Sequence, residues 1–394
     1  MKQIATFLIT LCLFTTVKSQ VAIQDSLALV DFYDSTGGVN WTNHINWQTS
    51  APVNSWFGIT VTAGRVVGID LTKNSISGNN LNGSIPASIG KLNGLLFLRL
   101  GNNKLTGAIP TTLFNLTNLK ELSLNNNQLK QTIPYSFGSL TNLTKLSLAG
   151  NQLVGSIPNS ISNLTKLSYL DLGFNQLTDS IPPSLGGLTN LSYLDLFGNH
   201  LTGSIPVSIG TLTNLTYLAL GDNQIRGSIP TSFGNLTNLL ELDLGGNQLS
   251  GSIPVSLGNL TNLYRINLGY NQLSGSIPTS IGNLTNLNFL YLNDNALSDS
   301  LPASFVNLSK LSELNIRDNQ ISGSIPPFFS TFSRLYNLFL NNNQLSGSVS
   351  SSLSPSLTQL NLSSNQLSGT IPTEIGNLNK LINEQHVPVI GVKN

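Results

Sequence analysis

Two aspartates, Asp171 and Asp195, come nearest to a catalytic pair in this sequence, because they lie 24 positions apart in segments of near-identical pattern. If successive segments stack as coils, the carboxylates would lie about 5 Å apart, as in a retaining glycosidase. Catalysis would also need one carboxyl with a raised pKa and a site closed to water. The open face of a sheet is expected to supply neither. A glycan-acting enzyme is therefore a remote alternative.

Other catalytic chemistry finds no support in the sequence. His44, His200 and His386 fall in distant segments, and Cys12 is the only cysteine. No nucleophile elbow, zinc-protease helix, phosphate-binding loop or helix–loop–helix calcium loop is present. The sequence thus predicts no catalytic residue, no metal site and no cofactor.

Aromatic and acidic side chains recur every 24 residues in columns beside the aspartate pair. Exposed aromatic rings beside fixed hydrogen-bonding groups form binding hot spots and sugar-stacking platforms. The alternative is that tyrosine simply suits strands and that repeats drift by duplication. The candidate ligand-binding set, with Tyr193 and Asp195 at its centre, comprises Tyr169, Asp171, Phe174, Tyr193, Asp195, Phe197, Tyr217, Asp222, Glu241, Asp243, Arg265 and Tyr270.

The elements that must position these side chains come from one repeated unit. Thirteen units, mostly of 24 residues, begin at Val66, Leu95 and so on to Leu357. Asn74 marks the first unit, and the period shortens to 22 residues before the last. Periods of 20–29 residues with the pattern LxxLxLxxNxL indicate leucine-rich repeats. An asparagine recurs once per unit at Asn103, Asn127, Asn151, Asn175, Asn199, Asn223, Asn247, Asn271, Asn295, Asn319, Asn343 and Asn365.

The physics of one unit accounts for its pattern. Leu242 and Leu244 alternate as the inward residues of a short strand, and Asn247 follows where the chain turns. Its side chain can bond backbone groups of adjacent coils that would otherwise be buried without partners. Each unit buries roughly seven apolar side chains, too few to fold alone, so stability must come from stacking. We therefore expect Asn223→Ala to destabilise the chain more than the same change at a surface residue such as Asn341.

The return segment Leu249-Ser-Gly-Ser-Ile-Pro254 resembles the plant-type leucine-rich repeat over about residues 25–380. That class occurs in plant receptor-kinase ectodomains, polygalacturonase-inhibiting proteins and secreted bacterial proteins. The resemblance implies a right-handed solenoid with a parallel β-sheet on its concave face and 3₁₀ or irregular segments on its convex face. It also implies recognition of a protein, peptide or glycan.

The N-terminal cap departs from the plant pattern CxWxGVxC. Asn54 and Val61 occupy the two cysteine positions around Trp56, so the cap has no disulfide there. We expect Trp41, Trp47 and Trp56 to anchor the cap by packing, beside a helix over residues 26–33 that Gly37 and Gly38 close. The cysteine-free cap is more similar to the secreted bacterial relatives.

Charge and targeting narrow the function further. A basic residue followed by an apolar stretch predicts a signal peptide over residues 1–19. We expect a cap at 20–65, the repeat array at 66–380 and a C-terminal cap or tail at 381–394. The formal net charge of +1 and the lack of basic clusters argue against nucleic acid, and no downstream segment is apolar enough to span a membrane.

The sequence as a whole predicts a secreted or cell-surface binding protein that recognises its ligand through the concave sheet. An adhesive or structural surface protein with weak contacts spread along the array is the main alternative. Sequons such as Asn115, Asn163, Asn235 and Asn283 follow the repeat consensus and are interpreted as structural. The ligand and the oligomeric state stay open.

Overall fold

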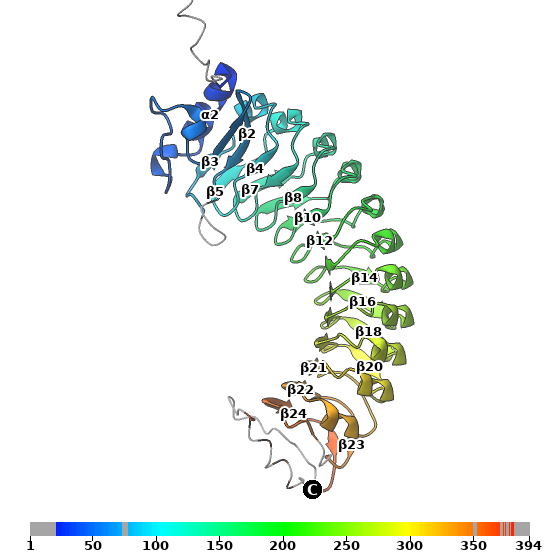
Figure 1. Ribbon diagram of the computed structural model, residues 1–394. Coiled ribbons are helices and arrows are strands. Elements are labelled where there is room, and N and C mark those ends of the chain that lie inside the picture. The colour runs from blue at the N-terminus through cyan, green and yellow to red at the C-terminus, as the bar shows by residue number, and fades with distance from the viewer. Residues whose placement is uncertain are drawn as a thin grey trace, which may run out of the picture.

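The computed structural model describes residues 21–72, 78–349 and 353–370, together with Thr373, Ile375, Leu378, Lys380 and Leu381. The predicted signal peptide, Asn74 and the tail beyond Leu381 lie outside the described residues. Figure 1 shows the described chain as a curved stack of coils, with the long sheet lining the inner side of the arc and short helical turns along the outer side.

The inner sheet has fourteen strands in the part of the chain that the structure describes. β1 (Ile59–Thr62) pairs antiparallel with β2 (Arg65–Asp70), and every later strand joins in parallel. The later strands are β4 (Phe97–Arg99), β6 (Glu121–Ser123), β8 (Lys145–Ser147), β10 (Tyr169–Asp171), β12 (Tyr193–Asp195), β13 (Tyr217–Ala219), β15 (Glu241–Asp243), β17 (Arg265–Asn267), β19 (Phe289–Tyr291), β21 (Glu313–Asn315), β22 (Asn337–Phe339) and β24 (Gln359–Asn361).

Short parallel ribbons form beside the inner sheet where the chain leaves most of these strands; after β12 and β21 only isolated bridges form. They group as β3 (Asn82–Ser84), β5 (Lys104–Gly107), β7 (Gln128–Thr132), β9 (Gln152–Gly155) and β11 (Gln176–Leu177); β14 (Arg226–Gly227), β16 (Gln248–Gly251), β18 (Gln272–Ser276) and β20 (Ala296–Ser298); and β23 (Ser346–Gly347) with β25 (Gln366–Leu367).

The convex side is built from 3₁₀ turns, each preceded by the proline of the repeat, as Pro254 precedes η10. Proline fixes φ near the value that the turn needs and offers no N–H for a continuing strand. The turns are η3 (Ala87–Lys91), η4 (Thr111–Asn115), η5 (Tyr135–Ser139), η6 (Asn159–Asn163), η7 (Pro183–Gly187), η8 (Val207–Thr211), η9 (Thr231–Asn235), η10 (Val255–Asn259), η11 (Thr279–Asn283), η12 (Ala303–Asn307) and η13 (Pro327–Thr331). The predicted fold class, a concave parallel sheet with a 3₁₀ convex face, is confirmed.

The core runs the length of the array as stacked aliphatic layers. One unit contributes seven side chains that are at most 2% exposed, namely Leu239, Leu242, Leu244, Leu249, Ile253, Leu257 and Leu260. Because neighbouring units supply identical layers, each layer packs between two others.

Each repeat asparagine bonds its own coil to the preceding one. From Asn103 to Asn365, each side-chain oxygen accepts a hydrogen bond at 2.9–3.1 Å from a backbone N–H of the preceding coil. Each amide group donates to backbone carbonyls, as Asn247 does to Leu220 and Leu244 at 3.0 and 3.2 Å. The expectation that Asn341 lies on the surface was wrong, since this residue is only 8% exposed.

A second asparagine ladder, called the outer asparagine ladder below, lies on the segments between the 3₁₀ turns and the strands that follow them. The sequence analysis did not identify it. Each of its amides donates at 2.7–3.0 Å to a backbone carbonyl one coil earlier. The signal was present in the repeated Asn-Leu-Thr-Asn segment, whose second asparagine carries the bond. The members are Asn118, Asn142, Asn190, Asn214, Asn238, Asn262 and Asn286.

The N-terminal cap is held by aromatic packing and by one ion pair whose carboxylate is buried. Its helix α2 (Ile23–Ser35) is longer than predicted and is followed by η1 (Gly38–Asn40) and η2 (Val53–Ser55). Trp41, Trp47 and Trp56 are buried as expected, and their rings contact one another with centroids 4.9 and 5.0 Å apart. Asp25, fully buried on α2, accepts hydrogen bonds from Arg65 on β2.

Candidate ligand-binding surface

Three tyrosines from neighbouring strands form a face-to-face stack on the concave sheet. In-register pairing of β10, β12 and β13 sets Tyr169, Tyr193 and Tyr217 beside one another. Their ring centroids are 4.3 and 4.4 Å apart, with interplanar angles of 9° and 4°. Each tyrosine is half-buried. The stacked rings cover each other's faces, so the stack offers mainly ring edges and hydroxyl groups to a ligand.

A column of aspartates runs beside this tyrosine stack, two residues further along each strand. Asp171 accepts from the Ser147 hydroxyl at 2.9 Å, and Asp195 accepts from the Tyr193 hydroxyl at 3.2 Å and the Phe197 amide at 2.9 Å. The third carboxylate is Asp243, beyond the buried Ala219. The column therefore follows the array axis with one interruption.

Burial raises the pKa of all three aspartates, Asp171, Asp195 and Asp243. The negative charge of Asp171 adds to this rise at Asp195, while the donated hydrogen bonds act in the opposite direction. The expectation that nothing on the open sheet would raise a carboxyl pKa was therefore wrong. The reason is that the tyrosine rings and neighbouring coils remove much of the water around the carboxylates.

The same environment keeps the tyrosines protonated. Burial, reinforced by the adjacent aspartates, raises the pKa of Tyr169 and Tyr217 to about 12 and raises that of Tyr193 further. An unfolded tyrosine ionises near pH 10. The stability that the neutral phenols contribute is thus complete below about pH 10 and is lost as pH rises toward 12.

We expect an alkaline spectrophotometric titration to resolve a late-ionising group of tyrosines. Replacing Tyr169, Tyr193 and Tyr217 together by phenylalanine should remove most of this late component while leaving the earlier one. Tyr291, whose pKa is also raised by burial, accounts for the rest. Tyr135→Phe, at a residue 72% exposed on the outer side, should leave the late component unchanged. Loss of the late component in the Tyr135 variant would contradict this assignment.

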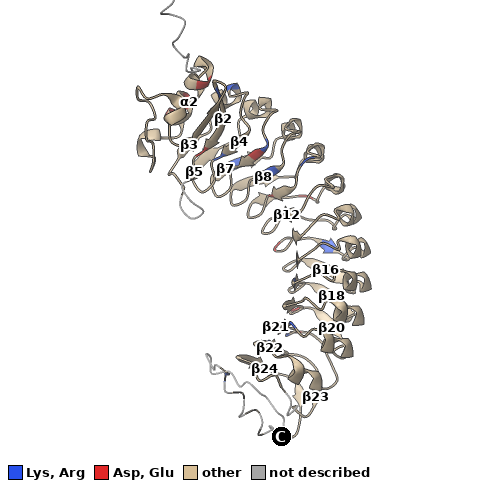
Figure 2. Ribbon diagram, in the orientation of Figure 1, with Lys and Arg blue, Asp and Glu red and all other residues tan. Residues whose placement is uncertain are grey.

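Charged residues are sparse along the chain (Figure 2). Ion pairs lie on the N-terminal side of the tyrosine stack and aspartate column, which together are called the patch. Arg99 binds Glu121 at 2.6 Å, and Lys145 lies 3.4 Å from Glu121 and 5.2 Å from the Tyr169 ring centroid. Burial acts to raise the pKa of Glu121, but the hydrogen bond and charge of Arg99, with the charge of Lys145, outweigh it and the pKa is lowered.

Arg265 borders the patch toward the C-terminus. Its guanidinium lies 3.8 Å from Asp243 and 5.5 Å from the ring centroid of Tyr291. The candidate set included Arg265 but left out Lys145 and Tyr291, although both occupy the same strand positions as the tyrosines or the aspartates.

Two exposed aromatic residues adopt a backbone conformation that bulky side chains rarely take. Phe174 and Tyr270 have φ of 51° and 54° and are 61% and 55% exposed. Such left-handed conformations cost free energy for bulky residues and concentrate at functional sites. The other units place small or polar residues there, namely Asn102, Asn126, Gly150, Gly198, Asp222, Gly246, Asp294, Asp318, Asn342 and Ser364.

The structure brings most of the predicted set together, but not all of it. Phe174 packs against Phe197 with ring centroids 5.3 Å apart, at the margin of the aspartate column. Glu241 continues the tyrosine column on β15, and the exposed Asp222 lies on the loop that follows β13.

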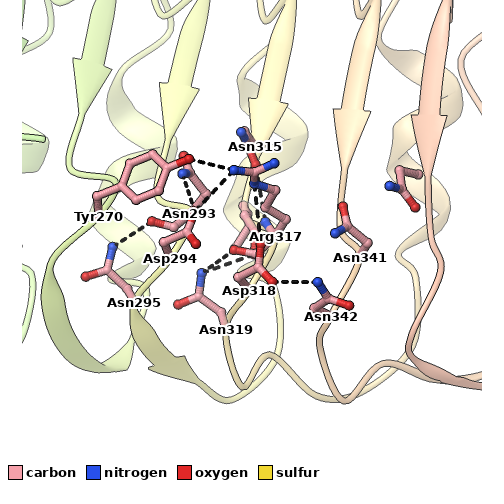
Figure 3. A network of polar contacts seen from close by, with 12 residues as sticks. Tyr270, Asn293, Asp294, Asn295, Asn315, Arg317, Asp318, Asn319, Asn341 and Asn342 are labelled. Carbon is pink, nitrogen blue, oxygen red and sulfur yellow. Dashed lines mark hydrogen bonds and ion pairs between the residues drawn. The ribbon is translucent and has the colours of Figure 1, made fainter. Parts of the chain in front are cut away.

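Tyr270 belongs to a separate polar network (Figure 3). Its hydroxyl accepts a hydrogen bond from Arg317 at 2.6 Å, and Arg317 also pairs with Asp294 and Asp318. Asp318 in turn accepts from Asn342. Arg317 was missed by the sequence analysis, and its distance of 47 residues from Tyr270 hides the contact.

Two further features of the described residues bear on the site. No helix among them is both long and apolar enough to cross a membrane. Within the same residues, no three or more His, Cys, Asp or Glu side chains gather where they could hold a metal ion.

Comparison with known proteins places the chain among repeat proteins. It matches the leucine-rich repeat region family at residues 151–279, and further leucine-rich repeat families at residues 98–153 and 261–321 and at residues 356–378. A comparison with curated proteins finds no match.

Solved structures give similarities over most of the chain. The plant peptide hormone receptor RGFR1 in complex with RGF2 is 37% identical with a TM-score of 0.71, covering 77% of this chain and 53% of the receptor chain. The chain thus spans about half the length of that receptor. A leucine-rich-repeat protein of Leptospira interrogans is 32% identical with a TM-score of 0.58, covering 77% of this chain and 82% of its own. A plant ice-binding protein is 28% identical with a TM-score of 0.58, covering 82% of this chain and 96% of its own.

Proposed function

Because the chain belongs to the leucine-rich-repeat family, we propose that it is an exported protein that binds a protein or peptide partner through its concave sheet, rather than an enzyme. The predicted signal peptide supports export. RGFR1, which has the same fold, was solved in complex with RGF2. The observation that carries the proposal is the tyrosine stack with its aspartate column at the centre of the concave sheet.

Several physical features make this surface suitable for binding. The tyrosines are rigid because each ring is stacked, so ordering them on a ligand costs little conformational entropy. Hydroxyl and carboxylate groups lie beside exposed phenylalanine, which combines directional bonds with apolar burial. A glycan would find few open ring faces on the stack, which favours a polypeptide ligand.

The test is a selection in parallel on a displayed peptide library and a glycan array, using the mature chain. Ligands from either source are then titrated against the double variant Tyr193→Ala, Asp195→Ala. We expect affinity to fall by at least about 2 kcal/mol, roughly thirtyfold, because the variant removes the centre of the patch.

The matched control is Tyr135→Ala with Asp31→Ala, since both residues are exposed and Tyr135 lies on the outer side. Its affinity should equal that of the unchanged protein. A ligand that binds both double variants equally would remove the proposed site. Avid binding only to cells or polymers, indifferent to the variant, would instead support the adhesive alternative.

A further inference from the structure

The centre of the concave sheet carries negative charge without basic residues. The strands β10, β12, β13 and β15 bear Asp171, Asp195, Glu241 and Asp243 and no lysine or arginine. The two basic residues nearest in sequence lie elsewhere: Lys166 bonds the outer asparagine ladder, and Arg226 belongs to the lateral strand β14.

Asp171 and Asp195 receive only neutral donors among the described residues. The hydroxyls of Ser147 and Tyr193 and the backbone amides of the following turns supply their hydrogen bonds. The charge of Lys145 lowers the pKa of Asp171, but Lys145 forms its ion pair with Glu121 on the N-terminal side and none with Asp171 among the described residues. Half-buried carboxylates without an ion-pair partner are costly, and a cation brought by a ligand would relieve that cost. The raised pKa of both aspartates has the same origin in burial.

Two phenylalanine rings, Phe174 and Phe197, form an apolar surface beside these carboxylates. The backbone amide of Phe197 binds Asp195 at 2.9 Å, and the Phe197 ring packs against Phe174, which is 61% exposed. Across the sheet, a ligand would therefore meet tyrosine edges, then carboxylates, then phenylalanine. Because strands repeat about every 4.8 Å along the array, an extended chain lying along it can meet several coils in turn.

We propose that this patch selects an extended polypeptide segment in which a lysine or arginine lies next to an apolar side chain. The positive group would lie over Asp171 and Asp195, and the apolar group would lie on Phe174 and Phe197. This specificity rests on the proposed binding function and narrows its ligand to one chemical class by charge complementarity.

The test uses a short fluorescent peptide in which lysine and phenylalanine alternate with glycine, titrated against the mature chain by anisotropy. Two companion peptides carry glutamate in place of lysine, or glycine in place of phenylalanine. We expect the lysine–phenylalanine peptide to bind best, the glutamate peptide not to bind, and added salt to weaken binding. Equal binding of the glutamate peptide would overturn the proposal.

The double variant Asp171→Asn, Asp195→Asn should weaken binding of the lysine peptides at least about tenfold, as expected when charge-assisted bonds are lost. The chain itself shows that asparagine fits there, since Asn267, Asn315 and Asn361 occupy the same column and accept the same local amide bond. The control Asp299→Asn, the same charge change at an exposed residue after β20, should have no effect. Phe174→Gly should remove only the advantage of the phenylalanine-containing peptide.

The results of these experiments distinguish the proposed charge preference from the proposed binding function. If selected ligands need Tyr193 but are neutral or acidic, or bind the Asp171→Asn, Asp195→Asn variant equally, the charge preference is wrong and the binding function stands. If no ligand depends on Tyr193, the proposed binding function of the concave sheet is wrong.

Discussion

Asn223→Ala is expected to lower the free energy of unfolding by about 3 kcal/mol, because alanine leaves several backbone groups without partners. The Asn223 side chain accepts from the Leu201 amide at 2.9 Å and donates to the carbonyls of Leu196, Leu220 and Gly221 at 2.9–3.1 Å. These bonds link two consecutive coils in mid-array. Urea unfolding followed by far-ultraviolet circular dichroism measures the change.

The control for this variant is Asn283→Ala. Asn283 is exposed at the end of η11, and its side chain forms no hydrogen bond among the described residues. Its loss should change stability little. Asn341 cannot serve as this control, since it is buried. Equal losses at Asn223 and Asn283 would show that the inner ladder adds no stability.

Asp25→Ala is expected to destabilise the cap by about 2–3 kcal/mol, because it removes three hydrogen bonds at a buried site. Asp25 is 0% exposed and accepts from the Arg65 guanidinium at 2.9 and 3.0 Å and from the Val66 amide at 2.9 Å. The variant leaves the Val66 amide unpaired where α2 meets the first parallel strand. The partial exposure of Arg65 limits the loss, since water can solvate the freed guanidinium.

The three tryptophans allow unfolding of the cap to be followed separately from unfolding of the repeat array. All of them lie in the cap, so fluorescence follows the cap while circular dichroism follows mainly the array. We expect the fluorescence transition of the variant to move to lower denaturant than the circular dichroism transition. Asp31→Ala, on the exposed side of the same helix, should leave both midpoints in place. A joint shift of both transitions would mean that cap and array unfold as one unit.

The fold was predictable because its signal is repeated. Leu242, Leu244 and Asn247 each have counterparts in nearly every unit, so a pattern that is weak once becomes decisive over the array. Asn341 shows the limit of this reasoning. Its column holds residues as different as Gly269, Phe197 and Arg317, and the burial of a single member depends on its neighbours rather than on the repeat.

The sequence predicted which residues of the candidate site lie side by side, but not how their rings stack or how burial changes their pKa. Counting along the repeat placed Tyr169, Tyr193 and Tyr217 side by side, but it could not show that the rings lie nearly parallel and cover one another. Nor could it show the raised pKa of Asp195, which depends on how much water the neighbouring coils exclude. Contacts between distant units, such as Arg317 with Tyr270, follow from side-chain length and loop shape.

The outer asparagine ladder has a mechanical consequence. Neighbouring coils are bonded at the inner strands, at the turn asparagines and again between the 3₁₀ turns and the strands, as where Asn214 donates to the Thr189 carbonyl at 2.8 Å. Because these three lines of hydrogen bonds lie at different places on the coil, one coil cannot rotate against the next without breaking one of them. The curvature of the inner surface is then set before any partner arrives, and a partner must match that radius rather than impose its own.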